Sequence, residues 1–157
     1  MKLSSSLVES INISGQGGAE KKLEPLLRAN GFERTSMPLY DFINPKTGER
    51  VEVKKQAGAQ WFDLAKYANM NEQDKDITML FVMHRSGLID SIHSIKLGKF
   101  LDMLCGDPNH YSSGFHWPAI QKLADLKKQH RGLQTKASVN IRKLVTKEYP
   151  NSFKKLY

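Results

Sequence analysis

Residues 41–56 read DFINPKTGERVEVKKQ, a pattern that predicts a β-hairpin. The central NPKTG is a strong turn signal, and it lies between two segments that favour extended backbone. Because side chains alternate along a strand, the two valines of the second segment would face one side of the hairpin. Glu52, Lys54 and Gln56 would share the other side, so three polar groups are expected on one face.

Asp41 and Glu52 place two carboxylates on the two halves of this hairpin, beside the ammonium of Lys54. If the two carboxylates face each other, they repel unless a cation lies between them. Hard oxygen ligands suit Mg²⁺, with Mn²⁺ as a substitute, and water and substrate phosphate complete its coordination. A metal held there would polarise a scissile phosphate, while Lys54 orients the attacking water and stabilises the transition state. The expected reaction is phosphodiester hydrolysis.

The same residues also allow a simpler interpretation. An exposed hairpin with one cross-strand ion pair has the same spacing, and Asp followed later by Glu-x-Lys is a loose pattern that often occurs by chance. Gln56 would contact the nucleophilic water or a phosphate if the site is catalytic. Otherwise it is an ordinary surface glutamine.

The rest of the chain predicts an α/β fold, from apolar residues at helical spacing and from short apolar runs bounded by turns. The predicted elements are a flexible polar lead-in over 1–18, a helix over 19–30, an extended stretch over 33–43, a helix from Trp61 to Met70, strands over 77–83 and 88–95, and a short helix over 97–106.

This order of elements, with Gly17-Gly18-Ala19-Glu20 opening the first helix, resembles the PD-(D/E)XK nuclease superfamily. The superfamily includes type II restriction endonucleases, several homing endonucleases and the archaeal-type Holliday junction resolvases. The resemblance covers residues 17–96, and residues 18–32 look particularly like the first helix of the resolvases. It implies a restriction endonuclease-like αβββαβ core, in which a central mixed sheet is flanked by helices.

The resemblance also implies a role for each matching residue. Asp41 and Glu52 would bind the metal, Val53 would add a backbone carbonyl, Lys54 would be the catalytic lysine and Glu20 would assist at the metal site. One departure from the family pattern is that Tyr40, and not a proline, precedes Asp41. Many members of this divergent superfamily also lack that proline.

The net charge of +8 is concentrated at the end of the chain. Residues 121–157 contain ten lysines and arginines against only Asp125 and Glu148, which accounts for the whole excess. Such a block is typical of nucleic-acid binding, an anionic membrane surface is the competing partner, and a merely solvated face is the third interpretation. The predicted DNA contacts are Lys127, Lys128, Arg131, Lys136, Arg142 and Lys143.

The length of 157 residues with 39% hydrophobic positions suits one globular domain. We expect a nuclease core over residues 1–110 and a basic extension over 111–157 within the same compact domain, formed by helices over 118–132 and 134–148. The single cysteine, Cys105, excludes an intramolecular disulfide and a cysteine-rich zinc site. No apolar stretch approaches the length of a membrane span, so we expect a cytoplasmic protein without membrane contact.

Two functions follow from these patterns. The first is an Mg²⁺-dependent DNA endonuclease that acts at a specific site or at branched DNA. Cutting both strands would then require a homodimer or a larger assembly, because a chain of this size has one active site. The alternative is a non-catalytic DNA-binding module that uses residues 121–157, with incidental carboxylates in the hairpin.

Overall fold

A six-stranded mixed sheet forms the centre of the computed structural model, which describes residues 1–15, 18–56, 60–67, 70–106 and 136–157. The strand order is β1-β2-β3-β5-β6-β8. The strands are β1 (Glu33–Arg34), β2 (Phe42–Ile43), β3 (Arg50–Gln56), β5 (Thr78–Arg85), β6 (Leu88–Lys96) and β8 (Lys154–Lys155). The chain therefore has the α/β architecture that its sequence predicts.

The predicted hairpin of residues 41–56 is confirmed as the antiparallel pair β2–β3, in which Phe42 lies opposite Val51. The Asn44 side chain stabilises the turn by accepting hydrogen bonds from the backbone amides of Lys46 and Thr47 at 3.0 and 3.3 Å. Such local bonding of an asparagine side chain is a common way to hold a turn.

Strands β3 and β5 pair in parallel, and all other neighbours in the large sheet are antiparallel. A parallel pair needs a long crossover. Here the crossover contains β4 (Gln60–Asp63) and two short 3₁₀ helices, η1 (Leu64–Tyr67) and η2 (Glu72–Asp76). The next connection, β5 to β6, is a two-residue turn in which Ser86 and Gly87 both have positive φ, as a type I′ hairpin requires.

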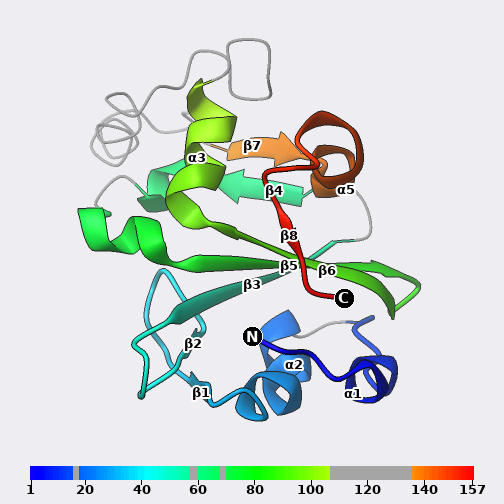
Figure 1. Ribbon diagram of the computed structural model, residues 1–157. Coiled ribbons are helices and arrows are strands. Elements are labelled where there is room, and N and C mark those ends of the chain that lie inside the picture. Colours follow the sequence, from blue (N-terminus) through cyan, green and yellow to red (C-terminus); the bar gives the residue numbers. More distant parts are fainter. Residues whose placement is uncertain (16–17, 57–59, 68–69, 107–135) are drawn as a thin grey trace.

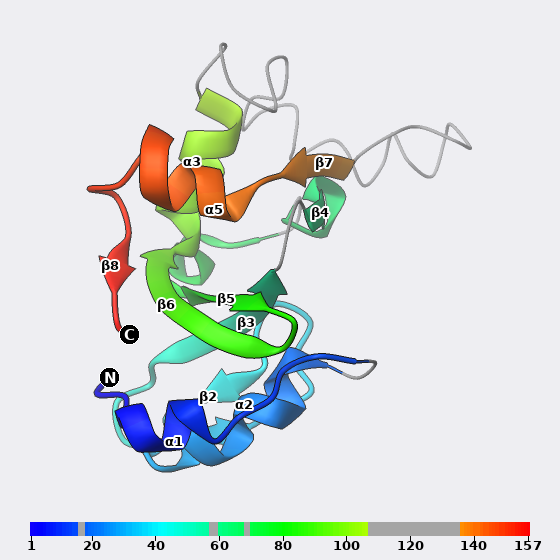
Figure 2. The same cartoon turned by 90° about the vertical axis from the view of Figure 1, so that its right-hand side faces the viewer.

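Helices cover both faces of the sheet (Figures 1 and 2). One face carries α1 (Ser5–Glu9) and α2 (Ala19–Arg28). The other carries α3 (Leu97–Gly106), the short helix α5 (Ile141–Lys143) with the π-helical turn η3 (Leu144–Glu148) that continues it, and a small antiparallel sheet of β4 and β7 (Lys136–Val139). None of the described helices is long and apolar enough to cross a membrane.

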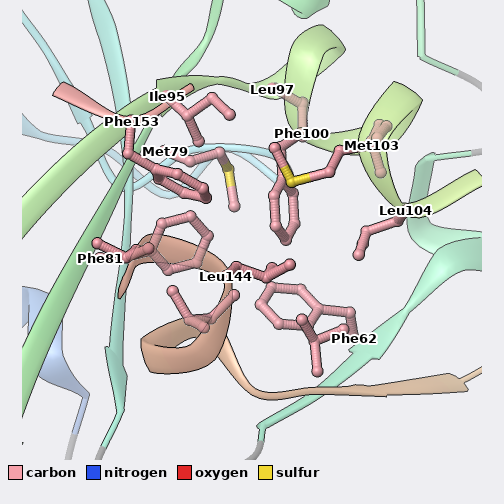
Figure 3. Close-up of a cluster of buried hydrophobic side chains, with 14 of the residues drawn as sticks. Phe62, Met79, Phe81, Ile95, Leu97, Phe100, Met103, Leu104, Leu144 and Phe153 are labelled. Atoms are coloured by element: carbon pink, nitrogen blue, oxygen red, sulfur yellow. The ribbon is translucent and has the colours of Figure 1, made fainter. Parts of the chain in front are cut away.

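Two clusters of buried side chains fill the space on either side of the sheet. On the α1–α2 side, α2 contributes three fully buried leucines, Leu23, Leu26 and Leu27, to the first cluster. On the other side, Phe62, Phe81 and Phe100 stack edge to face or tilted, with ring centroids 5.2–6.2 Å apart (Figure 3). The sheet is thus buried on both faces, as expected where a parallel pair lies at its centre.

The structure corrects the prediction that residues 1–18 form a flexible lead-in. Ser5–Glu9 forms α1, and the Ser4 hydroxyl caps this helix by accepting a hydrogen bond from the Leu7 amide. Val8 and Ile13 are fully buried, and the Ile13 amide donates to the Gly87 carbonyl at 2.9 Å. Because polar residues surround Val8 and Ile13 in the sequence, the sequence pattern does not indicate that these two residues belong to the core.

The predicted helix from Trp61 to Met70 is also wrong, because Gln60–Asp63 forms strand β4 and, of the residues that the structure describes there, only Leu64–Tyr67 is helical, as a 3₁₀ turn. β4 pairs with β7, a segment more than 70 residues further along the chain. A partner at that distance leaves no periodic signal within residues 61–70, and tertiary pairing therefore overrides the local helical spacing.

The predicted basic helical extension requires a similar correction. Lys136–Val139 is strand β7, Lys154–Lys155 is strand β8, and within the described residues 136–157 the helical turns cover Ile141–Glu148 alone. The predicted helix over 118–132 lies outside the described residues. The predicted helix over 19–30, the strands over 77–83 and 88–95 and the helix over 97–106 are confirmed as α2, β5, β6 and α3.

Candidate active site

Asp41 lies beside β3, at the point where the chain enters the hairpin just before β2. Its amide donates to the Val51 carbonyl at 2.8 Å, and its carboxylate oxygen Oδ2 accepts a hydrogen bond from the Val53 amide at 2.8 Å. The carboxylate thus accepts the hydrogen bond that a main-chain carbonyl would accept if β2 extended further toward its N-terminal end. This bond fixes the Asp41 carboxylate beside the peptide that joins Glu52 to Val53.

Glu52 is a buried carboxylate, with 4% of the residue exposed. Its Oε1 lies 2.8 Å from Lys54 Nζ and 3.1 Å from Lys66 Nζ. A buried carboxylate without such partners would be strongly destabilising, and the two ammonium groups supply the opposite charge that it needs. Glu52 and Lys54 share one face of β3, as the alternation of side chains predicts, while the Val51 and Val53 side chains pack on the other face.

Glu20 lies in the first turn of α2, and its Oε1 is 3.9 Å from an Arg34 guanidinium nitrogen. The negative charges of Glu52 and Glu20 both raise the pKa of the Asp41 carboxyl. The charges of Glu20, Glu52 and Lys54 therefore all act on the Asp41 carboxyl.

The pKa of Asp41 is raised from 3.8 to about 6. Burial of the carboxyl is the largest cause, the Val53 amide and Lys54 oppose it, and the carboxylates of Glu52 and Glu20 add to it. The folded chain therefore binds this proton more tightly than the unfolded chain, and stability falls as pH rises between 3.8 and about 6. An added cation would lower this pKa by compensating the neighbouring negative charges.

Gln56 is buried and contacts the backbone rather than the space around the carboxylates. Its Nε2 donates to the Val139 carbonyl at 3.0 Å, and its Oε1 accepts from the Ile141 amide at 2.7 Å. This side chain joins the end of β3 to the junction between β7 and α5. The geometry gives Gln56 a structural role and does not favour the predicted contact with water or phosphate.

We expect Gln56→Leu to lower the free energy of unfolding by about 2–4 kcal/mol, because it leaves a buried amide and a buried carbonyl without partners. Urea denaturation followed by circular dichroism measures the change. Gln73→Leu, at an exposed position of η2, is the matched control and should change stability by less than about 0.5 kcal/mol. Equal effects of the two substitutions would show that the Gln56 bonds do not stabilise the fold.

Lys66 is the residue at this site that sequence reasoning missed. It belongs to η1, and its ammonium reaches Glu52 and lies 5.9 Å from the centroid of the Tyr67 ring. The phenol of Tyr67 is buried, and burial together with Glu52 and Asp63 raises its pKa above the ordinary value. No sequence pattern connects Lys66 to Glu52, because the crossover after β3 sets their approach.

Three of the six predicted DNA contacts, Lys127, Lys128 and Arg131, lie outside the described residues. Lys136 belongs to β7. A guanidinium nitrogen of Arg142 lies 2.9 Å from Asp90 Oδ2, and Lys143 Nζ lies 3.3 Å from Glu148 Oε1. The charges of Arg142 and Lys143 are therefore partly compensated within the protein.

Within the described ranges, no group of three or more His, Cys, Asp or Glu side chains lies close enough together to hold a metal ion. The Asp41 and Glu52 carboxylates would therefore supply a cation with a partial set of hard oxygen ligands. Mg²⁺ commonly binds in this way, through one or two carboxylates, and takes its other ligands from water and substrate.

Comparison with known proteins does not indicate a function, so the geometry of the site is the main evidence. No protein-family model matches the chain, and no curated protein sequence matches it.

Proposed function

We propose that this chain is a metal-dependent DNA endonuclease of the PD-(D/E)XK type, in which Asp41, Glu52 and Lys54 form the catalytic centre. The observation that carries the proposal is the arrangement at β3. The Asp41 carboxylate lies 2.8 Å from the Val53 amide, and Lys54 Nζ lies 2.8 Å from the neighbouring Glu52 carboxylate. Two acidic groups and one cation thus meet at a single stretch of strand.

The order of elements also supports the proposal. Helix α2 is followed by the antiparallel strands β1, β2 and β3, and β5 then pairs in parallel with β3. This is the order that the resemblance leads us to expect, except that β4 and two 3₁₀ turns replace the helix between β3 and β5. The 3₁₀ turn η1 in this crossover supplies Lys66, whose ammonium contacts the Glu52 carboxylate.

Asp41 and Glu52 are the residues that would hold Mg²⁺ or Mn²⁺, and Glu20 would act on the site through its negative charge, as it does on the pKa of Asp41. When bound, the cation would supply Lewis-acid stabilisation of negative charge on the scissile phosphate. The raised pKa of Asp41 fits this assignment, because neighbouring carboxylates cause part of the shift and a cation would relieve their repulsion.

Lys54 would orient the attacking water and donate hydrogen bonds to a phosphate oxygen. Its side chain is 25% exposed, so its ammonium can reach a ligand in solvent. Lys66 holds the same Oε1 of Glu52 at 3.1 Å. Glu52 would therefore remain paired with Lys66 while Lys54 moves onto the substrate, which gives the two lysines different roles.

Metal binding at this site should weaken in acid, because a cation and a proton compete for the Asp41 carboxylate. Below a pKa of about 6, we expect the affinity for Mn²⁺ to fall about tenfold for each pH unit. Electron paramagnetic resonance of free Mn²⁺ in a pH series measures this. Asp41→Asn should bind Mn²⁺ weakly, with no titration near that pKa. The same pH dependence in Asp41→Asn as in the unmodified chain would contradict the assignment.

Nuclease assays test the proposal itself. The purified chain is incubated with supercoiled plasmid, linear duplex and a synthetic four-way junction, in Mg²⁺, Mn²⁺ or EDTA. We expect cleavage of at least one substrate with either metal and none in EDTA. Binding without cleavage under every metal condition would instead favour a non-catalytic DNA-binding module. If cleavage occurs, cross-linking and sedimentation would test whether a homodimer forms, as cutting both strands requires.

A further inference from the structure

A polar cavity of about 350 Å³ lies at the end of β6, near the start of α3 and beside β8. Its polar lining consists of three lysines, three hydroxyl residues and one glutamate: Lys96, Lys99, Lys154, Ser94, Ser152, Thr78 and Glu49. We call this cavity the lysine pocket. Strand β8 brings Lys154 to it by pairing antiparallel with β6, so that Lys154 lies opposite Ser94 (Figures 1 and 2).

The lysine pocket carries an excess of positive charge. Within the described part of the chain, neither Lys99 nor Lys154 forms an ion pair. Among the described residues, Lys96 donates to two neutral oxygens, the Asp76 carbonyl at 3.1 Å and the Thr78 hydroxyl at 3.3 Å. Glu49 is the one acidic residue among those that line the cavity. Three like charges around one cavity repel each other, and an anion would relieve that repulsion.

The lysine pocket is separate from the candidate active site. Ser94 and Lys96 alternate with Ile95 along β6 and share the face of Ile92, which packs with the α1–α2 cluster. Glu52 faces the opposite side of the sheet. The charge excess therefore needs an explanation of its own.

We propose that the lysine pocket binds a phosphate group, either of a nucleic-acid backbone or of a free nucleotide. The three ammonium groups and the two serine hydroxyls can all donate hydrogen bonds to oxygen. A phosphate offers more acceptor positions than a carboxylate, and lysine is a common phosphate ligand. The cavity has room for the phosphate group and part of the sugar to which it is attached. This inference does not depend on catalysis at Asp41 and Glu52.

Two-dimensional NMR of the full chain tests the proposal, with inorganic phosphate, AMP and a short single-stranded oligonucleotide as separate titrants. We expect chemical-shift changes at the amides of Ser94, Lys99 and Lys154. The double substitution Lys99→Gln with Lys154→Gln should weaken phosphate and AMP binding at least about tenfold. Lys46→Gln, at an exposed position of the β2–β3 turn, is the matched control and should leave both affinities unchanged.

The oligonucleotide distinguishes the two sources of phosphate. If the pocket binds a nucleic-acid backbone, the oligonucleotide binds more tightly than AMP, and the double substitution reduces the slope of log affinity against log salt by about 1.4. Tighter binding of AMP would identify a nucleotide site. The proposal is overturned if none of the three titrants shifts the pocket amides, or if the doubly substituted chain binds all three as the unmodified chain does.

Discussion

Replacing Glu52 by glutamine should lower the rate of Mg²⁺-dependent DNA cleavage by about 10³-fold, equivalent to about 4 kcal/mol of transition-state stabilisation. The substitution keeps the size of the side chain and removes its charge. It would take away one of two carboxylates for the metal, and it would leave Lys54 and Lys66 without the oxygen that both now contact at 2.8 and 3.1 Å. Both losses act on the catalytic step.

Single-turnover cleavage of the best substrate from the nuclease assays measures this effect. Glu24→Gln, on α2, is the matched control, because Glu24 pairs with Arg28 at 3.1 Å and lies outside the candidate site. Glu52→Asp, which keeps the charge, should retain more activity than Glu52→Gln. Circular dichroism establishes that each variant is folded. A folded Glu52→Gln chain that cleaves within about threefold of the unmodified rate would rule out Glu52 as a metal ligand.

The second large effect is expected in the core, where Phe81→Ala should lower the free energy of unfolding by about 3–5 kcal/mol. Phe81 is fully buried at the centre of β5, and its ring lies 6.2 Å from Phe62, 5.2 Å from Phe100 and 6.2 Å from Phe153, centroid to centroid. These partners come from β4, from α3 and from the segment just before β8. The ring therefore joins the crossover and the C-terminal segment to the sheet.

Chemical denaturation measures the loss, and Leu88→Ala is the control at a residue that is 66% exposed. The control should change stability by less than about 0.5 kcal/mol. Phe81 also lies opposite Lys54 in the parallel register, so its loss should loosen the strand that carries the candidate site. A change below about 1 kcal/mol for Phe81→Ala would mean that this aromatic cluster is not the core of the fold.

The elements predicted correctly are those whose signals are local. The NPKTG turn, the alternation of polar and apolar residues in β3 and the apolar run of β5 each depend on neighbours within about ten residues. The same local rule placed Glu52 and Lys54 on one face of the strand. For this reason the candidate site could be located in the hairpin from the sequence alone.

The elements predicted incorrectly depend on distant partners. β4 exists because β7 pairs with it, and α1 is held because Val8 and Ile13 are buried against the sheet. The roles of Lys66 and Gln56 have the same origin, since one reaches Glu52 from the crossover and the other binds the backbone at Val139 and Ile141. Periodicity cannot reveal contacts of this kind.

The basic residues 121–157 show that net charge alone is an incomplete guide to a binding surface. Arg142 and Lys143 pair with Asp90 and Glu148, whereas Lys154 from the same block forms no ion pair within the described residues and lines the lysine pocket. Folding thus separates charges that are compensated within the protein from charges that are open to a partner.

The most direct test of the central claim is paramagnetic relaxation by Mn²⁺ in the 157-residue chain, because it locates the metal without requiring a known DNA substrate. At low Mn²⁺ we expect the amide signals of Asp41, Val53 and Lys54 to broaden before all others. This broadening should disappear in the chain with Asp41→Asn and Glu52→Gln together. If the three signals stay sharp, or broaden equally in the substituted chain, then Asp41 and Glu52 do not form a metal-binding centre.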